Sequence, residues 1–265
     1  MKIGILGSGE VAQAIAPKML GLEHEVMISA RDLDREKDKG EWGSLPSVNA
    51  WVRKQASEHL RAYGGSFAEA ARFGELLFNC TSGSHSMEVL EAAGRDNLKG
   101  KIMIDLANPF EFSNDVPVMT ISNTESLGER IQNTYPDLKV VKTLNHVSAE
   151  LMTNPQLLAG EHDLLICGNS VDAKKWVIEN VLEGWFGWTS VIDIGTITGA
   201  RAMEMYLMLW MRLWEIFKTE KFNFKYIFEA KAPAKNAAKK TAGIKKGKKA
   251  SKKRRAGKQG VRRKI

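Results

Sequence analysis

The chain has 265 residues, of which 43% are hydrophobic, enough for a globular protein with a sizeable core. No run of about 18 apolar residues is free of charges, no signal-peptide cleavage site follows the apolar start, and two cysteines make no disulfide framework. These features argue against a membrane or secreted protein, so we expect a cytoplasmic one with reduced thiols at Cys80 and Cys167.

The N-terminal third predicts a β-α-β unit followed by an irregular segment. "KIGILG" is a short apolar run that predicts a buried strand, and "EVAQAIAPKMLGL" has helical spacing, with Pro17 as a point where the helix could bend. "HEVMISA" predicts the second strand. Residues 32–66 are charged and rich in turns, and we expect a helix near 47–62 that ends at Gly64-Gly65.

The rest of the chain alternates strands and helices. Ser66 and Glu69 have the spacing of a capping box at the start of a short helix. Strands are predicted at "ELLFNC", "KIMIDLA", "LKVVKTLN", "DLLICG" and "TSVIDIG", and helices at "SMEVLEAAG", "SLGERIQNTYP", "VDAKKWVIENVLEGWF" and "TGARAMEMYLMLWMRLWEIFK". This alternation predicts an α/β fold with a doubly wound, mostly parallel Rossmann sheet and a C-terminal helical segment.

A glycine motif connects the first predicted strand to the first helix. The residues Gly7-Ser8-Gly9-Glu10-Val11-Ala12 fit the pattern G-x-G-x-x-G/A. In this pattern the first glycine permits a tight turn, and the second lets the backbone approach a pyrophosphate at the start of the helix. The pattern alone is weak evidence, but its position between strand and helix predicts a dinucleotide site.

Polar residues end the second predicted strand, where NAD sites usually have an acidic residue for the ribose 2′-hydroxyl. Ser29 stands at about that place, with Arg31 and Arg35 after it. Guanidinium groups offer charge-assisted donors to a 2′-phosphate, so these residues predict NADP rather than NAD. As alternatives, Asp32 could bind the ribose after a small shift of register, or the arginines could be ordinary solvated charges.

Several stretches together resemble one family. These are "KIGILGSGEVAQAIAPKMLGLEHEVMISAR", "IDLANP" at 104–109, "VVKTLNHVSAELMTNP" at 140–155, "DLLICGNSVDAKK" at 163–175, and "ARAMEMYLMLWMRLW" with "FNFKYI" within 200–227. They are similar to the deazaflavin (coenzyme F-420)-dependent NADP oxidoreductases, whose cofactor domain is shared by pyrroline-5-carboxylate reductases and the cytosolic part of six-transmembrane metalloreductases. The resemblance covers most of residues 1–227.

The resemblance implies hydride exchange between NADPH and a second redox carrier in a cleft at the carboxyl ends of the strands. The cofactors would carry the chemistry, so we expect no catalytic side chain and no metal ligand. Carried over by position, the phosphate turn is Gly7 to Val11, and Ser29, Arg31 and Arg35 match the 2′-phosphate site. The remaining cofactor-binding residues implied are Thr81, Ser82, His85, Asn108, Pro109 and Asn145.

Two departures from the family pattern concern the acceptor. His146 stands where a small hydroxyl residue is common, and it could donate to a substrate carbonyl or be a satisfied histidine at a strand end. The segment 32–66 is longer than usual and could cover the cofactor, reshape the acceptor site or be a surface insertion. A deazaflavin, an ordinary flavin, or a small carbonyl or imine are all compatible acceptors.

We expect three regions in the chain. Residues 1–195 form the NADP-binding Rossmann domain, and residues 196–229 form a helix that completes the active-site cleft and mediates a homodimer. The Met, Leu and Trp of this helix are typical of a core or dimer interface, with a flavin-stacking face as the minority reading. Residues 230–265 form a disordered basic tail.

The charge is divided between body and tail. Residues 230–265 hold 16 of the 39 lysines and arginines and no acidic residue, so residues 1–229 hold 23 basic and 31 acidic side chains, although the whole chain is +8. Such a tail binds phosphate backbones without sequence preference, which makes nucleic acid or another polyanion the expected partner. As alternatives, it could be a nuclear-targeting stretch, an anchor to an anionic surface or a tether onto the acidic body. An alternative function is therefore a redox-sensing NADP-binding regulator whose effector is the tail.

Overall fold

The computed structural model describes residues 1–38, 44–58, 61–114 and 116–229. The chain divides into two units, residues 1–226 and residues 227–265. Only residues 227–229 of the second unit are described, and they form no helix or strand. The prediction of a disordered tail at 230–265 lies outside the described residues.

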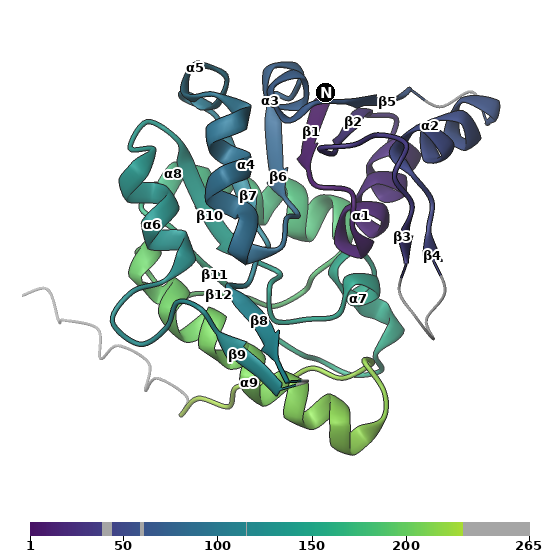
Figure 1. Ribbon diagram of the computed structural model, residues 1–265. Helices are drawn as coiled ribbons and strands as arrows, with labels where there is room; N and C mark the ends of the chain where they lie inside the picture. Colours follow the sequence, from purple (N-terminus) through teal and green to yellow (C-terminus); the bar gives the residue numbers. More distant parts are fainter. Residues whose placement is uncertain (39–43, 59–60, 115, 230–265) are drawn as a thin grey trace, which may run out of the picture. The chain divides into compact units, whose positions relative to one another are not determined.

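One sheet of eight strands forms the centre of the first unit, in the order β12-β11-β10-β7-β6-β1-β2-β5 (Figure 1). All neighbours are parallel except β10 and β11, so β11 and β12 run opposite to the other strands. The order β5-β2-β1-β6-β7-β10 is that of a doubly wound dinucleotide-binding sheet, which confirms the predicted fold. The strands are β1 (Lys2–Leu6), β2 (Glu25–Ser29), β5 (Ala62–Gly65), β6 (Leu76–Asn79), β7 (Ile102–Asp105), β10 (Lys139–Thr143), β11 (Leu164–Cys167) and β12 (Val191–Asp193).

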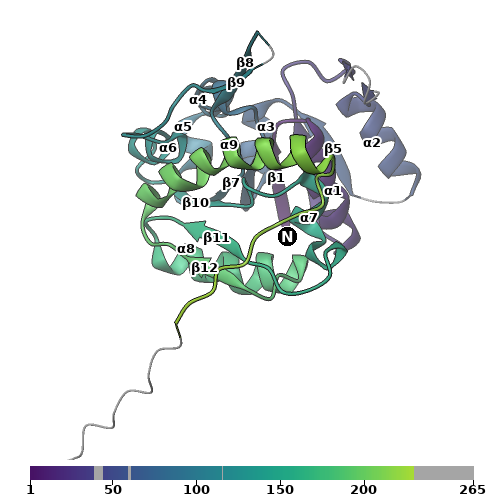
Figure 2. The same ribbon diagram turned by 90° about the horizontal axis from the view of Figure 1, so that it is seen from below.

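Helices cover both faces of this sheet (Figure 2). On one face α1 (Glu10–Gly21), α2 (Val48–Ser57), α7 (Ala149–Thr153), α8 (Val171–Trp176) and the π-helical η4 (Val177–Phe186) share a hydrophobic cluster. On the other face the cluster includes α3 (Phe67–Phe73), α4 (Ser86–Ala93), α5 (Arg95–Leu98), α6 (Leu127–Thr134) and α9 (Ala200–Phe217). Side chains alternate along β1, so Ile3 and Ile5 join the first cluster and Leu6 joins the second.

The capping box at the start of α3 is confirmed, with the Ser66 side chain accepting from the Glu69 backbone and the Glu69 carboxylate accepting from Ser66. Pro17 lies inside α1. The long helix predicted from "VDAKKWVIENVLEGWF" forms as α8 followed by the π-helical η4.

The prediction that Gly64-Gly65 ends a helix is wrong. The helix α2 ends at Ser57, and both glycines belong to β5, which pairs with β2. A Cβ on Gly64 would lie 2.7 Å from Val48 Cγ1, so this strand is glycine-rich because α2 packs closely on it.

Two short antiparallel hairpins were not predicted. They pair β3 (Lys37–Asp38) with β4 (Ser44–Leu45), and β8 (Phe110–Ser113) with β9 (Val116–Met119). The remaining short elements are the 3-10 turns η2 (Gly83–His85), η3 (Pro155–Leu157) and η5 (Ile197–Gly199). Among the helices within the described ranges, none has the length and apolar content needed to cross a membrane.

Candidate functional site

A cavity of about 720 Å³ opens where the strand order reverses, between β1 and β6. This is the place at which doubly wound sheets bind their ligands, and the volume is that of a typical ligand site. The lining residues come from the carboxyl ends of β1, β2 and β6, from the segment after β2, and from α3, η2 and α4. They are Gly7, Ser8, Gly9, Ser29, Ala30, Arg31, Asp32, Arg35, Glu36, Phe67, Cys80, Thr81, Ser82, His85 and Val89.

The predicted phosphate turn forms one end of this cavity. Gly7 has φ +114°, and a Cβ there would lie 2.6 Å from the Cys80 carbonyl oxygen, so glycine is required. Gly9 is the N-cap of α1 and makes no side-chain cap, which leaves N–H groups of the first turn for an anion. Glu10 and Val11 begin the helix without lining the cavity.

The segment 32–66 is tied to this turn. Gln13 of α1 donates from Nε2 to the Ser8 carbonyl and to the Pro46 carbonyl, both at 3.2 Å. The Asn49 backbone N–H donates to the Leu33 carbonyl at 3.0 Å. These bonds hold the described part of the segment beside the phosphate turn rather than away from the site.

The residues predicted for the 2′-phosphate lie at the cavity, but they differ in whether their polar groups already have a partner within the protein. Ser29 is fully buried, and its hydroxyl donates to the Ile5 carbonyl at 2.8 Å. Arg31 and Arg35 line the cavity, and Arg31 forms an exposed ion pair with Glu88 at 2.9 Å. The Asp32 carboxylate accepts the Asp34 backbone N–H at 2.9 Å, a turn that occupies one of its oxygens.

The loop after β6 brings hydroxyl groups and a histidine to the cavity. Thr81 donates to Asn79 Oδ1 at 2.8 Å and lies 2.6 Å from the Ser86 hydroxyl. Ser84 lies 3.1 Å from the Ser82 hydroxyl and 3.0 Å from His85 Nδ1. The loop is thus ordered by its own polar contacts, with Thr81, Ser82 and His85 facing the cavity.

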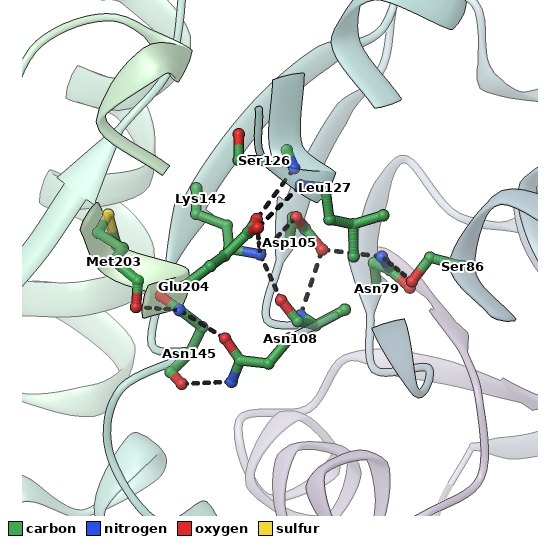
Figure 3. A network of polar contacts seen from close by, with 12 residues as sticks. Asn79, Ser86, Asp105, Asn108, Ser126, Leu127, Lys142, Asn145, Met203 and Glu204 are labelled. Atoms are coloured by element: carbon green, nitrogen blue, oxygen red, sulfur yellow. Dashed lines mark hydrogen bonds and ion pairs between the residues drawn. The ribbon is translucent and has the colours of Figure 1, made fainter. Parts of the chain in front are cut away.

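Asn108, Pro109 and Asn145 do not line the cavity. Asn108 donates to the Asn145 carbonyl at 2.7 Å, and the Asn145 amide donates to Asn108 Oδ1 at 2.9 Å and to the Met203 carbonyl at 3.0 Å (Figure 3). These bonds join the ends of β7 and β10 to α9. A Cβ on Gly83 would lie 2.1 Å from the Asn108 carbonyl oxygen, so the backbone of the cavity loop packs directly on this pair.

A buried charge network that no sequence pattern predicted lies next to these asparagines. Lys142 Nζ lies 2.9 Å from Asp105 Oδ2 and 3.0 Å from Glu204 Oε1, and the three side chains are 0–2% exposed. Lys142 also donates to the Ala107 carbonyl. Burial alone would lower the pKa of Lys142, but Asp105 and Glu204 outweigh it and raise the pKa.

The network reaches both α6 and the cavity loop. Glu204 accepts the backbone N–H groups of Leu127 and Gly128 at 2.8 and 3.0 Å, at the start of α6. Asp105 Oδ1 accepts from Asn79 Nδ2 at 2.8 Å, and Asn79 in turn holds Thr81. The only signal in the sequence was the presence of charged residues, Asp105 and Lys142, inside apolar strands.

His146 has the contacts of a satisfied histidine. It is 2% exposed, its Nε2 accepts the Leu165 N–H at 3.3 Å, and its Nδ1 lies 3.4 Å from Asn145 Oδ1. Its ring stacks on Phe224 with centroids 5.5 Å apart. Burial, and then the charge of Lys142, lower its pKa to about 3, so it is neutral. This geometry favours the structural role over donation to a substrate.

The described residues around the cavity have features that can bind a dinucleotide. Burial raises the pKa of Cys80, so this thiol is not an activated nucleophile. In the described part of the chain, no three His, Cys, Asp or Glu side chains gather in a way that could hold a metal. A helix N-terminus, a glycine turn and two arginines around one cavity fit the phosphates of NADP.

Comparisons with known proteins agree with this geometry. The family model described as NADP oxidoreductase, coenzyme F420-dependent, matches residues 2–109. The crystal structure of a candidate F420-dependent NADP reductase from Arthrobacter sp. FB24 is 40% identical, with a TM-score of 0.77, and covers 86% of this chain and 100% of that one.

Two curated relatives are more distant in sequence. The F420-dependent NADP reductase of Methanocaldococcus jannaschii is 26% identical over 77% of this chain and 88% of its own length. Metalloreductase STEAP3 of Rattus norvegicus is 29% identical over 81% of this chain. The chain spans only 38% of the length of that metalloreductase.

Proposed function

Since the chain belongs to the coenzyme F420-dependent NADP oxidoreductase family and is an NADP-dependent oxidoreductase, we propose that it exchanges hydride between NADP(H) and a deazaflavin. The observation that carries the proposal is the cavity of about 720 Å³, with a glycine turn at one end and arginines at its rim. An ordinary flavin and a small carbonyl or imine are the alternative acceptors.

In the proposed complex the backbone N–H groups from Gly7 to Val11 bind the pyrophosphate. Arg31 and Arg35 pair with the 2′-phosphate, and the buried Ser29 supports them from the end of β2. The loop residues Thr81, Ser82 and His85 contact the ribose and nicotinamide. Asn108, Pro109 and Asn145 act indirectly, because they fix the strand ends on which this loop rests.

The chain's contribution to the reaction is binding, orientation and exclusion of water. NADP(H) would supply or accept the hydride when bound. Reduction of the acceptor also takes up one proton, which we assign to solvent rather than to a side chain. His146 is neutral and hydrogen-bonded, and burial raises the pKa of the Cys80 thiol, so we give neither an acid–base role.

The first experiment titrates the full chain with NADPH and with NADH, following nicotinamide fluorescence, and then offers each acceptor and records NADPH oxidation. Tight NADPH binding with turnover of a deazaflavin supports the proposal. Turnover with a flavin, carbonyl or imine alone identifies a different acceptor. Tight binding without turnover favours the redox-sensing regulator, and binding of neither nucleotide refutes the NADP site.

Replacing Arg31 tests the 2′-phosphate role. A guanidinium bonded to a phosphate contributes about 1.5–3 kcal/mol. Arg31→Ala should therefore weaken NADPH binding by about ten- to a hundredfold and leave NADH binding nearly unchanged. Arg72→Ala, an exposed arginine on α3, is the matched control. Equal losses for both nucleotides would show that Arg31 does not read the 2′-phosphate.

We also propose a homodimer formed through α9. Its exposed apolar residues include Met205, Leu209, Ile216 and Phe217, at 44–58% exposure, which is unusual for a solvated helix. In this proposal residues 196–229 complete the acceptor end of the cleft, next to the NADP-binding residues 1–195. Sedimentation of the full chain tests the dimer, and a monomer at micromolar concentration would contradict it.

The basic residues of 230–265 support a polyanion as a further partner, and we propose a cytoplasmic location for the protein. The tail would bind nucleic acid or another polyanion through its charge alone, without base readout, because it contains no aromatic residue to stack on bases.

A further inference from the structure

Glu88 is a carboxylate at the mouth of the proposed nucleotide site to which the proposed function gives no role. It lies on α4, and its Oε1 is 2.9 Å from Nη2 of Arg31, which follows β2. The two side chains are 61% and 67% exposed. The pair therefore joins the β2 side of the cavity to the α4 side through two side chains that water reaches.

A second hollow adjoins the main cavity at Arg31. Its volume is about 240 Å³, and it shares Ala30, Arg31, Phe67 and Val89 with the main cavity. Glu88 lines the second hollow and not the first. Its carboxylate thus holds the guanidinium of Arg31 from outside the cavity in which a nucleotide would lie.

The charges of the described residues around the mouth nearly cancel. Arg31, Arg35, Asp32 and Glu36 all line the cavity, and Glu88 adds a further negative charge beside Arg31. A 2′-phosphate that pairs with Arg31 must compete with this carboxylate for the same donors and lie close to its charge. NADH has no 2′-phosphate and meets no such competition.

We propose that Glu88 is a specificity-determining residue that holds Arg31 and opposes the 2′-phosphate, so that it limits the preference for NADP(H) over NAD(H). The inference rests on the proposed nucleotide site and assigns a new residue to its selectivity. An exposed ion pair changes an equilibrium by up to about fivefold, which sets the size of the effect.

The test measures dissociation constants of the full chain for NADPH and NADH in Glu88→Gln and Glu88→Lys. Glu88→Gln should tighten NADPH binding by about two- to fivefold and leave NADH binding unchanged. Glu88→Lys should tighten NADPH binding further. Glu91→Gln is the matched control, because Glu91 is exposed on the same helix but lines neither hollow. Its charge instead contributes to the raised pKa of Tyr135. The gains should shrink in about 1 M salt.

Competition with 2′,5′-ADP and 5′-AMP isolates the phosphate that Glu88 is proposed to oppose. An unchanged ratio of NADPH to NADH affinity in both variants would overturn the inference, as would equal tightening of both nucleotides. Weaker NADPH binding by Glu88→Gln would also overturn it, since Glu88 would then position Arg31 for the phosphate. If the unaltered chain binds neither nucleotide, the proposed function itself fails, which is a distinguishable result.

Discussion

Gly7 cannot carry a side chain, for two separate reasons. Its φ of +114° disfavours any L-residue, and an added Cβ would lie 2.6 Å from the Cys80 carbonyl oxygen. Gly7→Ala should therefore lower the free energy of unfolding by about 1–3 kcal/mol and weaken NADPH binding, as measured by urea unfolding and titration. Gly21→Ala is the control, because a Cβ there meets nothing within 4 Å, and it should be neutral or slightly stabilising. Equal behaviour of the two variants would contradict the strain at Gly7.

His146 should make stability fall in mild acid. Its pKa is about 3 in the folded protein and 6.5 in the unfolded chain. At a pH between these two values, only the unfolded chain binds the proton. The free energy of unfolding should drop by about 2 kcal/mol from this residue between about pH 7 and about pH 5. Urea unfolding at both pH values measures the loss. His146→Gln removes the titration, and an equally steep loss in that variant would assign the pH dependence to other groups.

At the scale of elements, the buried charges join three strands and two helices. Lys142→Met would leave Asp105 and Glu204 without their cation in a site that water does not reach. The expected loss is about 3–5 kcal/mol in the free energy of unfolding, measured with urea. Arg212→Met, which breaks the exposed pair with Glu215 on α9, should change stability by less than about 1 kcal/mol. A similar, small loss in both variants would show that the network carries no stability.

Local patterns predicted the elements that depend on neighbours in sequence. The capping box at Ser66 and the glycine turn at Gly7 were predicted because their chemistry lies within a few residues. The strand β5 was missed because its glycines fit a helix end equally well, and only the pairing with β2 decides between the two. The hairpin β8–β9 has strands of only four residues each, and they are largely exposed, so the short alternation in "FEFS" does not mark a strand of the core.

In the candidate site, too, features that depend on neighbouring residues were predicted, and contacts between residues far apart in the sequence were not. The cavity collects the predicted turn, both arginines and the loop after β6, since each follows a parallel strand whose carboxyl end reaches the same edge. Glu88 and Glu204 could not be predicted, because their partners Arg31 and Lys142 are far away in sequence. Nor could the sequence show that the Ser29 hydroxyl is used by the Ile5 carbonyl.

For the whole molecule, the uneven charge predicts salt-dependent binding to polyanions. Residues 230–265 carry 16 basic side chains and no acidic one. The full chain should bind duplex DNA of any sequence, with an affinity that falls steeply between about 50 mM and about 200 mM salt, as measured by fluorescence anisotropy. A chain that ends at residue 229 should not bind, because its residues 1–229 are net acidic. Affinity that salt does not change, or that survives this truncation, would contradict the role of the tail.

The Lys142–Asp105–Glu204 network also constrains how this sequence can diverge. Replacing Lys142 alone leaves two carboxylates without their cation in the core, while an apolar set of similar volume at all three positions can be as stable as the ionic one. Intermediates that have lost the lysine but keep the carboxylates are the unstable ones. Among homologous sequences, the three positions are therefore expected to be inherited as a block, either all charged or all apolar.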